Sequence, residues 1–217
     1  MTANNNKYCI FPISLIGGMF ENKKRTILKI LHFVVKKQMQ ILKYDTYIEK
    51  MLTTTKYFGI DFFKVFGSEH TFNSIDSDIS QTKIAKVKIK VEILLDYFKN
   101  EKSEFEIECF CGYCALKSMI GNKKIFKGTV KFLLSRMFPD SNNLKNKYKK
   151  HYHYRKLMKE LEINWGLKKL SSNARGFYFS FTGDYDELEQ IRAQKKAKWE
   201  AIKQAKRKAI LTTKNEK

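Results

Sequence analysis

The feature that most constrains the fold of this chain is a change in the spacing of its apolar residues at Gly166. From Ser103 to that glycine, apolar residues recur every three or four positions, which is the spacing of amphipathic helices. Beyond it, Phe177, Phe179 and Phe181 alternate with more polar residues, which is the spacing of a half-buried strand. The sequence therefore predicts helices followed by a small β-hairpin, in a mainly α fold of the α+β kind.

The clearest local signal is the start of the first of these helices. Ser103 and Glu106 form the S-x-x-E pattern of a capping box, in which each side chain accepts a hydrogen bond from the backbone N–H of the other residue. An apolar run follows and ends at Gly121, a residue type that readily adopts the positive φ favoured after a helix. The pattern predicts a helix over residues 104–120.

Two further helices and the hairpin complete this part of the chain. Gly128 and Thr129 indicate a helix start, and Pro139, which lacks a backbone N–H, ends that helix. A polar, basic linker is expected over 140–150, before a third helix over 151–163. The hairpin strands are expected at 165–170 and 176–181, with the turn at 171–175.

The first hundred residues are predicted to be largely helical. Helical spacing of apolar residues favours a long helix capped by Asn22 and a shorter helix from Thr46. Residues 59–80 contain scattered Gly, Ser, Asn and Asp, which favours an irregular loop and the best candidate boundary. The expected elements are a strand or extended arm over 8–16 and helices over 22–44, 46–58 and from about Asp78 or Thr82 to Asn100, with 87–91 left open as a strand.

The last segment is predicted to be a basic helix. Asp184 and Glu187 repeat the capping pattern, and the helix is expected to run to about Leu211 without a wide apolar stripe. Such a helix either follows phosphates as a basic arm or remains a solvated tail. Its candidate phosphate contacts are Arg192, Lys195 and Lys196. We expect three parts: an N-terminal helical region over 1–100, a C-terminal domain over 101–183, and the basic helix and tail over 184–217.

The charge of the chain points to a polyanionic partner. The 217 residues include 43 Lys and Arg against 22 Asp and Glu, a formal net charge of +21. Lys and Arg bind phosphates whatever the base sequence, so nucleic acid is the first expected partner. Hydrophobic residues make up 43% of the chain, which excludes a disordered polycation. No apolar run approaches the length of a membrane span, and no membrane partner is expected.

The order of three helices and a hairpin over residues 103–182 resembles the winged-helix branch of the helix-turn-helix proteins. In that family the third helix lies in the major groove of DNA, and the hairpin, or wing, contacts the backbone or the minor groove. The resemblance implies a winged-helix-like C-terminal domain that binds DNA rather than RNA. For the third helix and the linker before it, the implied contact residues are Lys145, Lys147, Lys149, Lys150, His151, Tyr152, Arg155, Lys156 and Lys159, while Tyr154, Leu157, Met158 and Leu161 pack inward. For the wing, they are Lys168, Lys169, Ser172, Asn173 and Arg175.

The cysteines are not expected to bind metal. Cys109, Cys111 and Cys114 form C-x-C-x-x-C, but on a helix the first two point about 200° apart and cannot share one zinc ion. Buried, reduced thiols and a cytoplasmic location are the expectation. Neither a metal site nor a cofactor is predicted.

Two short motifs resemble those of nucleases. His151-Tyr152-His153 is similar to the His-hydrophobic-His motif of rolling-circle endonucleases, and Arg25 with His32 fits the loose pattern of helical ribonucleases. The first motif has no acidic residue close by in the sequence, and the second arises readily by chance in a helix rich in Lys and Arg. The expectation is therefore a protein that is not an enzyme, with a nuclease as an alternative.

The leading hypothesis is a DNA-binding replication or transcription factor of a phage or mobile element. The segments F-E-I-E-C-F, L-L-S-R-M-F and L-E-I-N-W-G-L-K are similar to uncharacterised proteins of Bacteroidetes phages and mobile elements. The main alternative is a structural or assembly protein that coats nucleic acid, such as a ribosomal or virion protein. Residues 1–100 are left to homodimer contacts or to a protein partner.

Overall fold

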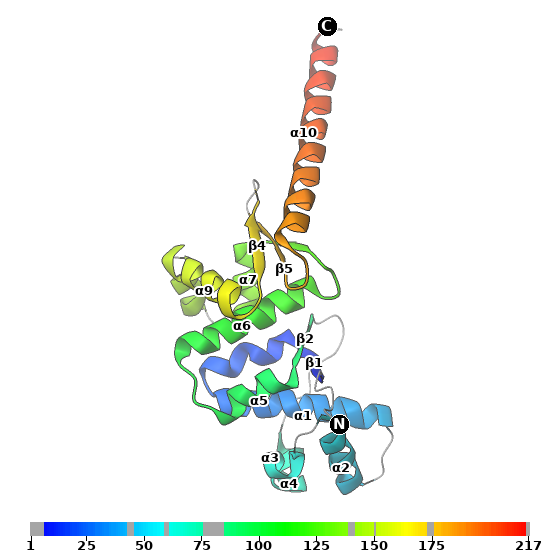
Figure 1. Cartoon of the computed structure of the whole chain (residues 1–217), viewed down its shortest axis with the longest axis vertical. Helices are drawn as coiled ribbons and strands as arrows, with labels where there is room; N and C mark the ends of the chain where they lie inside the picture. Colours follow the sequence, from blue (N-terminus) through cyan, green and yellow to red (C-terminus); the bar gives the residue numbers. More distant parts are fainter. Residues whose placement is uncertain are drawn as a thin grey trace.

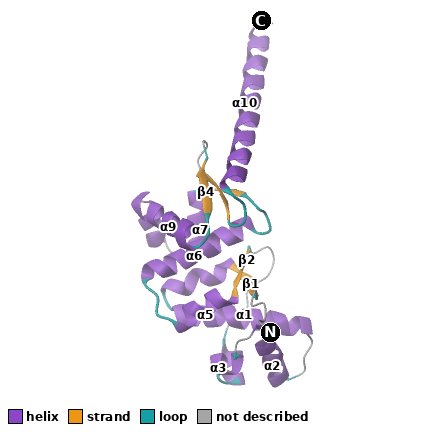
Figure 2. Cartoon of the chain, viewed as in Figure 1, coloured by secondary structure: helices purple, strands orange, loops and turns teal. Residues whose placement is uncertain are grey.

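The computed structural model describes residues 7–42, 46–58, 61–75, 85–138, 142–149, 151–172 and 176–215. The described chain is mainly helical with two small antiparallel sheets, as predicted (Figure 2). Its helices are η1, a 3-10 helix (Ile13–Phe20), α1 (Lys23–Leu42), α2 (Tyr47–Phe58), α3 (Phe62–Phe66), α4 (Glu69–Ser74), α5 (Val91–Lys99), α6 (Glu104–Ile120), α7 (Val130–Met137), α8 (Asn142–Lys149), α9 (His151–Asn164) and α10 (Tyr185–Asn215). Its strands are β1 (Tyr8–Pro12), β2 (Lys86–Lys90), β3 (Phe126–Gly128), β4 (Lys168–Ser171) and β5 (Phe177–Ser180).

The buried helix α6 is the centre of the fold. Its capping box is formed as predicted: the Ser103 hydroxyl accepts a 3.3 Å hydrogen bond from the Glu106 N–H, and the Glu106 carboxylate accepts one of 2.9 Å from the Ser103 N–H. The helix ends at Gly121, whose φ of 55° favours glycine. Almost every residue from Glu108 to the end of the helix is buried, because other elements cover it on all sides.

Both halves of the chain pack on α6. The helix contacts η1 and β2 from the first hundred residues, and α7, α9 and β3 from the remainder. Figure 1 shows α6 between these two groups of elements, and one continuous hydrophobic core includes residues from both. The division into 1–100, 101–183 and 184–217 stays a prediction, but its first two parts bury their apolar faces on the same helix.

The strand and helices at the N-terminus largely follow the sequence. β1 is the expected strand, but it ends at Pro12, and residues 13–16 belong to η1 instead. α1 begins after Asn22 and α2 after Thr46, and the side chain of each accepts a hydrogen bond from the backbone three residues on. These contacts satisfy N–H groups that a helix start would otherwise leave without a partner.

The first sheet joins β1 to β2 in antiparallel pairing. Val87 and Ile89 are buried while the lysines between and beside them are exposed, which is the alternation of a strand. The open alternative at 87–91 is therefore the better prediction. The expected helix over 82–100 is wrong across β2 and correct from Val91, where α5 begins.

The irregular loop expected over 59–80 is wrong where the structure describes it. α3 begins after Asp61 and α4 after Ser68, and these capping side chains accept backbone hydrogen bonds of 3.0 and 3.1 Å. Phe62 and Phe72 bury the two helices in the core. Helices of five and six residues span fewer than two turns, which leaves no periodic pattern in the sequence.

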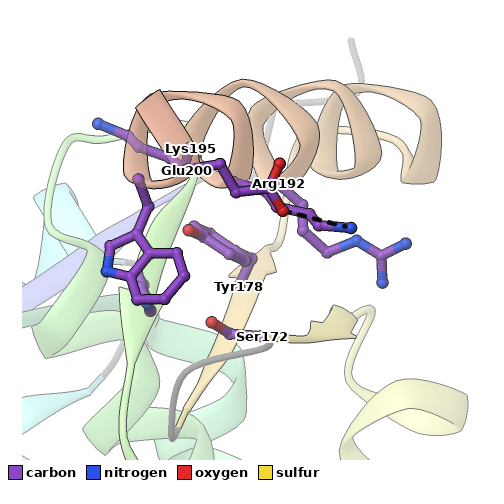
Figure 3. Close-up of a pocket in the computed structure, with 8 residues that line it drawn as sticks. Ser172, Tyr178, Arg192, Lys195 and Glu200 are labelled. Atoms are coloured by element: carbon purple, nitrogen blue, oxygen red, sulfur yellow. Dashed lines mark ion pairs between the residues drawn. The ribbon is translucent and has the colours of Figure 1, made fainter. Parts of the chain in front are cut away.

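The second sheet confirms the hairpin and adds a strand. β4 and β5 pair antiparallel as predicted, and β3 pairs along the other edge of β5, in the order β3-β5-β4. Three residues are too few to show alternation, so the sequence does not predict β3. Both faces of β5 are covered: Phe177 and Phe179 belong to the core, whereas Tyr178 faces α10 (Figure 3).

The linker expected over 140–150 is wrong, because residues 142–149 form α8. Tyr148 anchors this helix: its ring is 1% exposed and stacks on Phe138 at a centroid distance of 5.4 Å, and its hydroxyl donates a hydrogen bond to Glu108 of α6. One deep aromatic anchor among Lys and Asn residues gives little amphipathic signal, so the sequence favours a linker.

α10 begins on the second sheet and then leaves the body of the molecule. Asp184 and Glu187 cap it reciprocally, with hydrogen bonds of 2.8 and 3.2 Å, as predicted. Leu188 is buried, whereas all residues from Ala193 to Arg207 are exposed. The 31 residues span about 46 Å at 1.5 Å per residue, and Figure 1 shows the distal part clear of the body. No helix in the described residues combines the length and apolar character that crossing a bilayer requires.

Candidate nucleic-acid interface

One side of α9 is basic and exposed, as the sequence predicts. Leu157, Met158 and Leu161 are buried, and Tyr154 is half-buried, so the opposite side of the helix faces solvent. The exposed residues there, called the α9 face below, are His151, Tyr152, Arg155, Lys156 and Lys159. Tyr152 is 71% exposed, and its ring meets that of His153 edge-on at a centroid distance of 5.4 Å.

The positive charge of the α9 face is not neutralised by neighbouring carboxylates. Among the described residues, Arg155 and Lys159 make no ion pair, and the Lys156 ammonium lies 4.4 Å from the centroid of the Phe105 ring. The two acidic residues of the helix are engaged elsewhere: Glu162 pairs with Lys169 of β4 at 2.8 Å, and Glu160 accepts a 2.6 Å hydrogen bond from the Asn164 side chain. The face is therefore available to phosphates.

The side chain of Lys147 in α8 is half-buried and turns toward two carboxylates of α6. Its ammonium donates hydrogen bonds to the buried Glu108 carboxylate at 2.6 Å and to Glu104 at 3.2 Å. Burial alone would lower the pKa of Lys147, but the two carboxylates outweigh it and the pKa is raised. These contacts give Lys147 a part in the stability of α8, and its role as a phosphate contact stays a prediction. The side chains of Lys149 and Lys150 lie outside the described residues.

An open groove lies between α7, α8 and α9. Tyr154 and His151 contribute from α9 and Lys145 from α8, where it is half-buried. Lys131 contributes from α7, is exposed, and does not appear among the residues that the sequence singles out. Its position in the first turn of α7, two residues after the capping Thr129, is the signal that could have identified it. The full lining is Val130, Lys131, Leu134, Ser135, Lys145, Asn146, Tyr148, His151 and Tyr154.

The wing is only partly described. Lys168 and Lys169 of β4 are half-buried, and the ammonium of Lys169 is held by Glu162. Asn173 and Arg175, the residues expected at the tip, lie outside the described residues. Of the contact residues expected in the wing, the described chain thus includes Lys168, Lys169 and Ser172 but not the other two.

A pocket of about 510 Å³, called the α10 pocket below, lies where α10 crosses the second sheet. Figure 3 shows the Tyr178 ring between α10 and Ser172, with Arg192, Lys195 and Glu200 on the helix above. The pocket brings together the three predicted residues of α10, and it adds Lys127, Tyr178 and Trp199, which the sequence does not single out. Its complete lining is Lys127, Ser172, Tyr178, Arg192, Lys195, Lys196, Trp199 and Glu200.

The four cysteines are buried, free thiols. Burial raises the pKa of Cys9 and of Cys109 to about 12, and it raises the pKa of Cys111 and Cys114 as well. Protonated thiols in an apolar environment are poor metal ligands and poor nucleophiles. Within the described residues, no group of three or more His, Cys, Asp or Glu side chains is arranged to hold a metal ion.

The two nuclease-like motifs do not form sites in the structure. His151-Tyr152-His153 lies on α9, whereas the endonuclease motif that it resembles lies on a strand. Arg25 is exposed, but His32 is 3% exposed and packs on Phe72 at a ring-centroid distance of 4.3 Å. A buried, aromatic-packed histidine and an exposed arginine do not share a surface on which they could act together.

The exposed large apolar residues of the N-terminal region lie on β1 and on α2. Tyr8 and Ile10 of β1 are 40% and 51% exposed. Ile48 and Leu52, one turn apart, are 61% and 56% exposed. Contacts through this region with a second copy or another protein stay a prediction.

Two basic surfaces, the α9 face and the α10 pocket, are the candidate sites of the described chain. No protein-family model matches the chain, and comparison with curated proteins and with solved structures finds no similar protein.

Proposed function

We propose that this protein is a DNA-binding protein without enzymatic activity, in which a winged-helix-like unit from α6 to β5 holds the duplex. The observation that carries the proposal is the α9 face. Arg155, Lys156 and Lys159 project from one side of a helix without an ion pair in the described chain, next to the exposed Tyr152. Arg and Lys on such a helix can bind phosphates and the acceptor groups of guanine in the major groove.

The order of elements supports the winged-helix interpretation. Three helices of this unit, α6, α7 and α9, precede the β4–β5 hairpin, and α9 is followed directly by β4. In winged-helix proteins the third helix enters the major groove while the wing contacts the neighbouring backbone. α8 is an additional helix before α9, and it supplies Lys145 to the groove that His151 also lines.

Within this proposal the protein acts as a replication or transcription factor of a phage or mobile element, in a cytoplasm. The second candidate, a protein that coats nucleic acid, is favoured by one observation. The distal part of α10 is exposed and carries mainly Lys and Arg, which suits contacts that ignore base sequence. The two candidates differ in the dependence of binding on single residues of α9.

The test is a binding selection from random duplex DNA at two salt concentrations, followed by fluorescence anisotropy on the selected sequence. We expect Arg155→Ala to weaken specific binding by about tenfold, since a single base or phosphate contact contributes about 1–3 kcal/mol. Lys64→Ala removes a charge from an exposed position of α3 and serves as the matched control, with affinity unchanged within about twofold. If both variants lose the same DNA affinity and the selection yields no preferred sequence, the protein coats nucleic acid and is not a sequence-specific factor.

The absence of enzymatic activity has its own test. The purified protein is incubated with single- and double-stranded DNA and RNA in the presence of Mg²⁺ or Mn²⁺. We expect all four substrates to remain intact, because the described residues include no group of three or more His, Cys, Asp or Glu side chains that could hold a metal ion. Cleavage that persists through purification and is lost in a His151→Ala variant would restore the nuclease alternative.

A further inference from the structure

We propose that the α10 pocket binds an unstacked nucleoside phosphate, with the base on the Trp199 indole and the phosphate among the lysine and arginine side chains around it. The inference rests on the proposed function for its class of ligand. It goes beyond that function because it assigns a second site, on a different element from the α9 face. This site takes a nucleotide that is not paired in a duplex.

The pocket is built by one side of α10 and the outer face of the sheet. Arg192, Lys195 and Trp199 are three, then four residues apart, so they lie on the same side of the helix. Leu188, one turn before them, is fully buried and fixes this side toward β4 and β5. Tyr178 of β5 forms the floor of the pocket, as Figure 3 shows.

The aromatic residues of the pocket suit a flat, unpaired base. Trp199 is 61% exposed although it is one of only two tryptophans in the chain, and burial in the core does not explain its presence. Its ring lies 5.1 Å from the Lys203 ammonium, and the Tyr178 ring lies 5.5 Å from the Lys127 ammonium. Aromatic rings flanked by cations are the arrangement on which single-stranded bases stack.

The charges of the pocket suit a phosphate. Four cationic side chains line it, from Lys127, Arg192, Lys195 and Lys196, against the single carboxylate of Glu200. The ion pairs that these cations make with carboxylates are long, 3.8 Å for Arg192 to Glu189 and 3.9 Å for Lys196 to Glu200, so a phosphate oxygen can displace them. A duplex hides the faces of its bases, so the combination of stacking rings and cations selects an unpaired nucleotide.

The test uses the full chain with Trp165→Phe, which leaves Trp199 as the single indole. Its fluorescence is titrated with AMP, with single-stranded oligo-dT and with a duplex of the same length. We expect quenching by AMP or by oligo-dT and little change with the duplex. Quenching by AMP assigns a free nucleotide as ligand, whereas quenching by oligo-dT alone assigns a single-stranded segment of nucleic acid. Unchanged emission with both ligands would overturn the proposal.

Charge-matched variants separate the pocket from general attraction to a basic helix. Lys195 lines the pocket, whereas Lys198, on the same helix and also exposed, does not. We expect Lys195→Gln to weaken binding of the quenching ligand by about tenfold and Lys198→Gln by less than about twofold. Equal effects of the two variants contradict a built pocket. Trp199→Ala, measured by calorimetry in the otherwise unmodified chain, should weaken binding by at least about fivefold, and it provides the test if Trp165→Phe disturbs folding.

The failure of this inference can be told apart from failure of the proposed function. If duplex binding depends on Arg155 while AMP and oligo-dT leave Trp199 emission unchanged, the pocket proposal alone fails. If oligo-dT quenches Trp199 while duplex binding does not depend on Arg155, the pocket proposal stands and DNA binding by the α9 face fails.

Discussion

The ammonium of Lys147 in α8 donates a 2.6 Å hydrogen bond to the carboxylate of Glu108 in α6, which is 2% exposed. The same carboxylate accepts a hydrogen bond from the Tyr148 hydroxyl. A buried carboxylate is costly unless it is paired and hydrogen-bonded, and these two neighbours on α8 supply both. The pair thus joins the central helix to the segment that leads into α9.

Because of this pairing, we expect Lys147 to contribute to stability and Lys159 to contribute to DNA binding. Lys147→Ala leaves the Glu108 carboxylate buried without its ammonium, and we expect the free energy of unfolding to fall by about 1–3 kcal/mol. Lys159→Ala, on the α9 face, should leave stability unchanged and weaken DNA binding instead. Urea unfolding and DNA anisotropy on both variants check the prediction. A stable Lys147→Ala protein with weakened binding would return Lys147 to the interface.

The α9 face should contribute directly to the salt dependence of binding. Each lysine or arginine that neutralises a phosphate releases counterions, so the logarithm of the binding constant falls more steeply with the logarithm of salt concentration. We expect Lys159→Ala to make this slope shallower by about one unit, as for loss of one phosphate contact. Lys64→Ala is the control and should leave the slope unchanged. If neither substitution changes the slope of the binding constant with salt concentration, phosphate contact by α9 is contradicted.

The fold was predictable where apolar residues recur with a regular spacing or where both residues of a helix-capping pattern are present in the sequence. The capping boxes at Ser103 and Asp184 and the alternation around Phe179 identify α6, α10 and β5 from the sequence. α8 and β3 were not predictable, because what holds them is tertiary: Tyr148 reaching Glu108 in one case, and pairing with β5 in the other. Short elements held by distant partners leave no periodic signal of their own.

The candidate sites likewise divide into one that local spacing predicts and one that only tertiary contacts create. The α9 face could be predicted, because helical spacing alone separates Arg155 and Lys159 from the buried Leu157 and Leu161. The α10 pocket could not, since Tyr178 and Trp199 lie about 20 residues apart on a strand and a helix that only the fold brings together. The inward turn of Lys147 was likewise hidden, because the sequence does not reveal that Glu108 is its partner.

Gly176 should be required for the second sheet. A Cβ there would collide with the carbonyl oxygen of Gly128, and its φ of 142° is one that L-residues rarely adopt. Gly166 also has a positive φ, of 69°, but nothing lies within 4 Å of the position of its Cβ. We therefore expect Gly166→Ala to lower stability by about 1 kcal/mol and Gly176→Ala by clearly more. Thermal unfolding of the two variants makes the comparison, and equal losses would contradict the close approach of β3 and β5.

The buried thiols should make stability fall at alkaline pH. Burial raises the pKa of Cys9 from 9.0 to about 12, so the folded state keeps a proton that the unfolded chain releases. The stabilisation is complete below pH 9 and is lost as the pH rises toward 12. Comparison with Cys9→Ala isolates this thiol: between pH 9 and 11, wild-type stability should fall more steeply by roughly 1.4 kcal/mol per pH unit. Parallel curves from urea unfolding would show that Cys9 does not titrate differently in the two states.

Removal of the distal part of α10 decides between the basic arm and the solvated tail. The side chains of residues 201–207 are exposed, so a chain that ends at Glu200 loses no buried contact among them and should unfold at an unchanged temperature. It loses six cations and one carboxylate, counted over residues 201–217, among them the Lys203 that lies over the Trp199 ring, while the residues that line the α10 pocket remain. If this segment follows phosphates, non-specific DNA binding weakens and its salt dependence becomes shallower. Affinity and salt slope equal to those of the full chain would instead identify a solvated tail, and would leave the α9 face and the pocket to account for all binding.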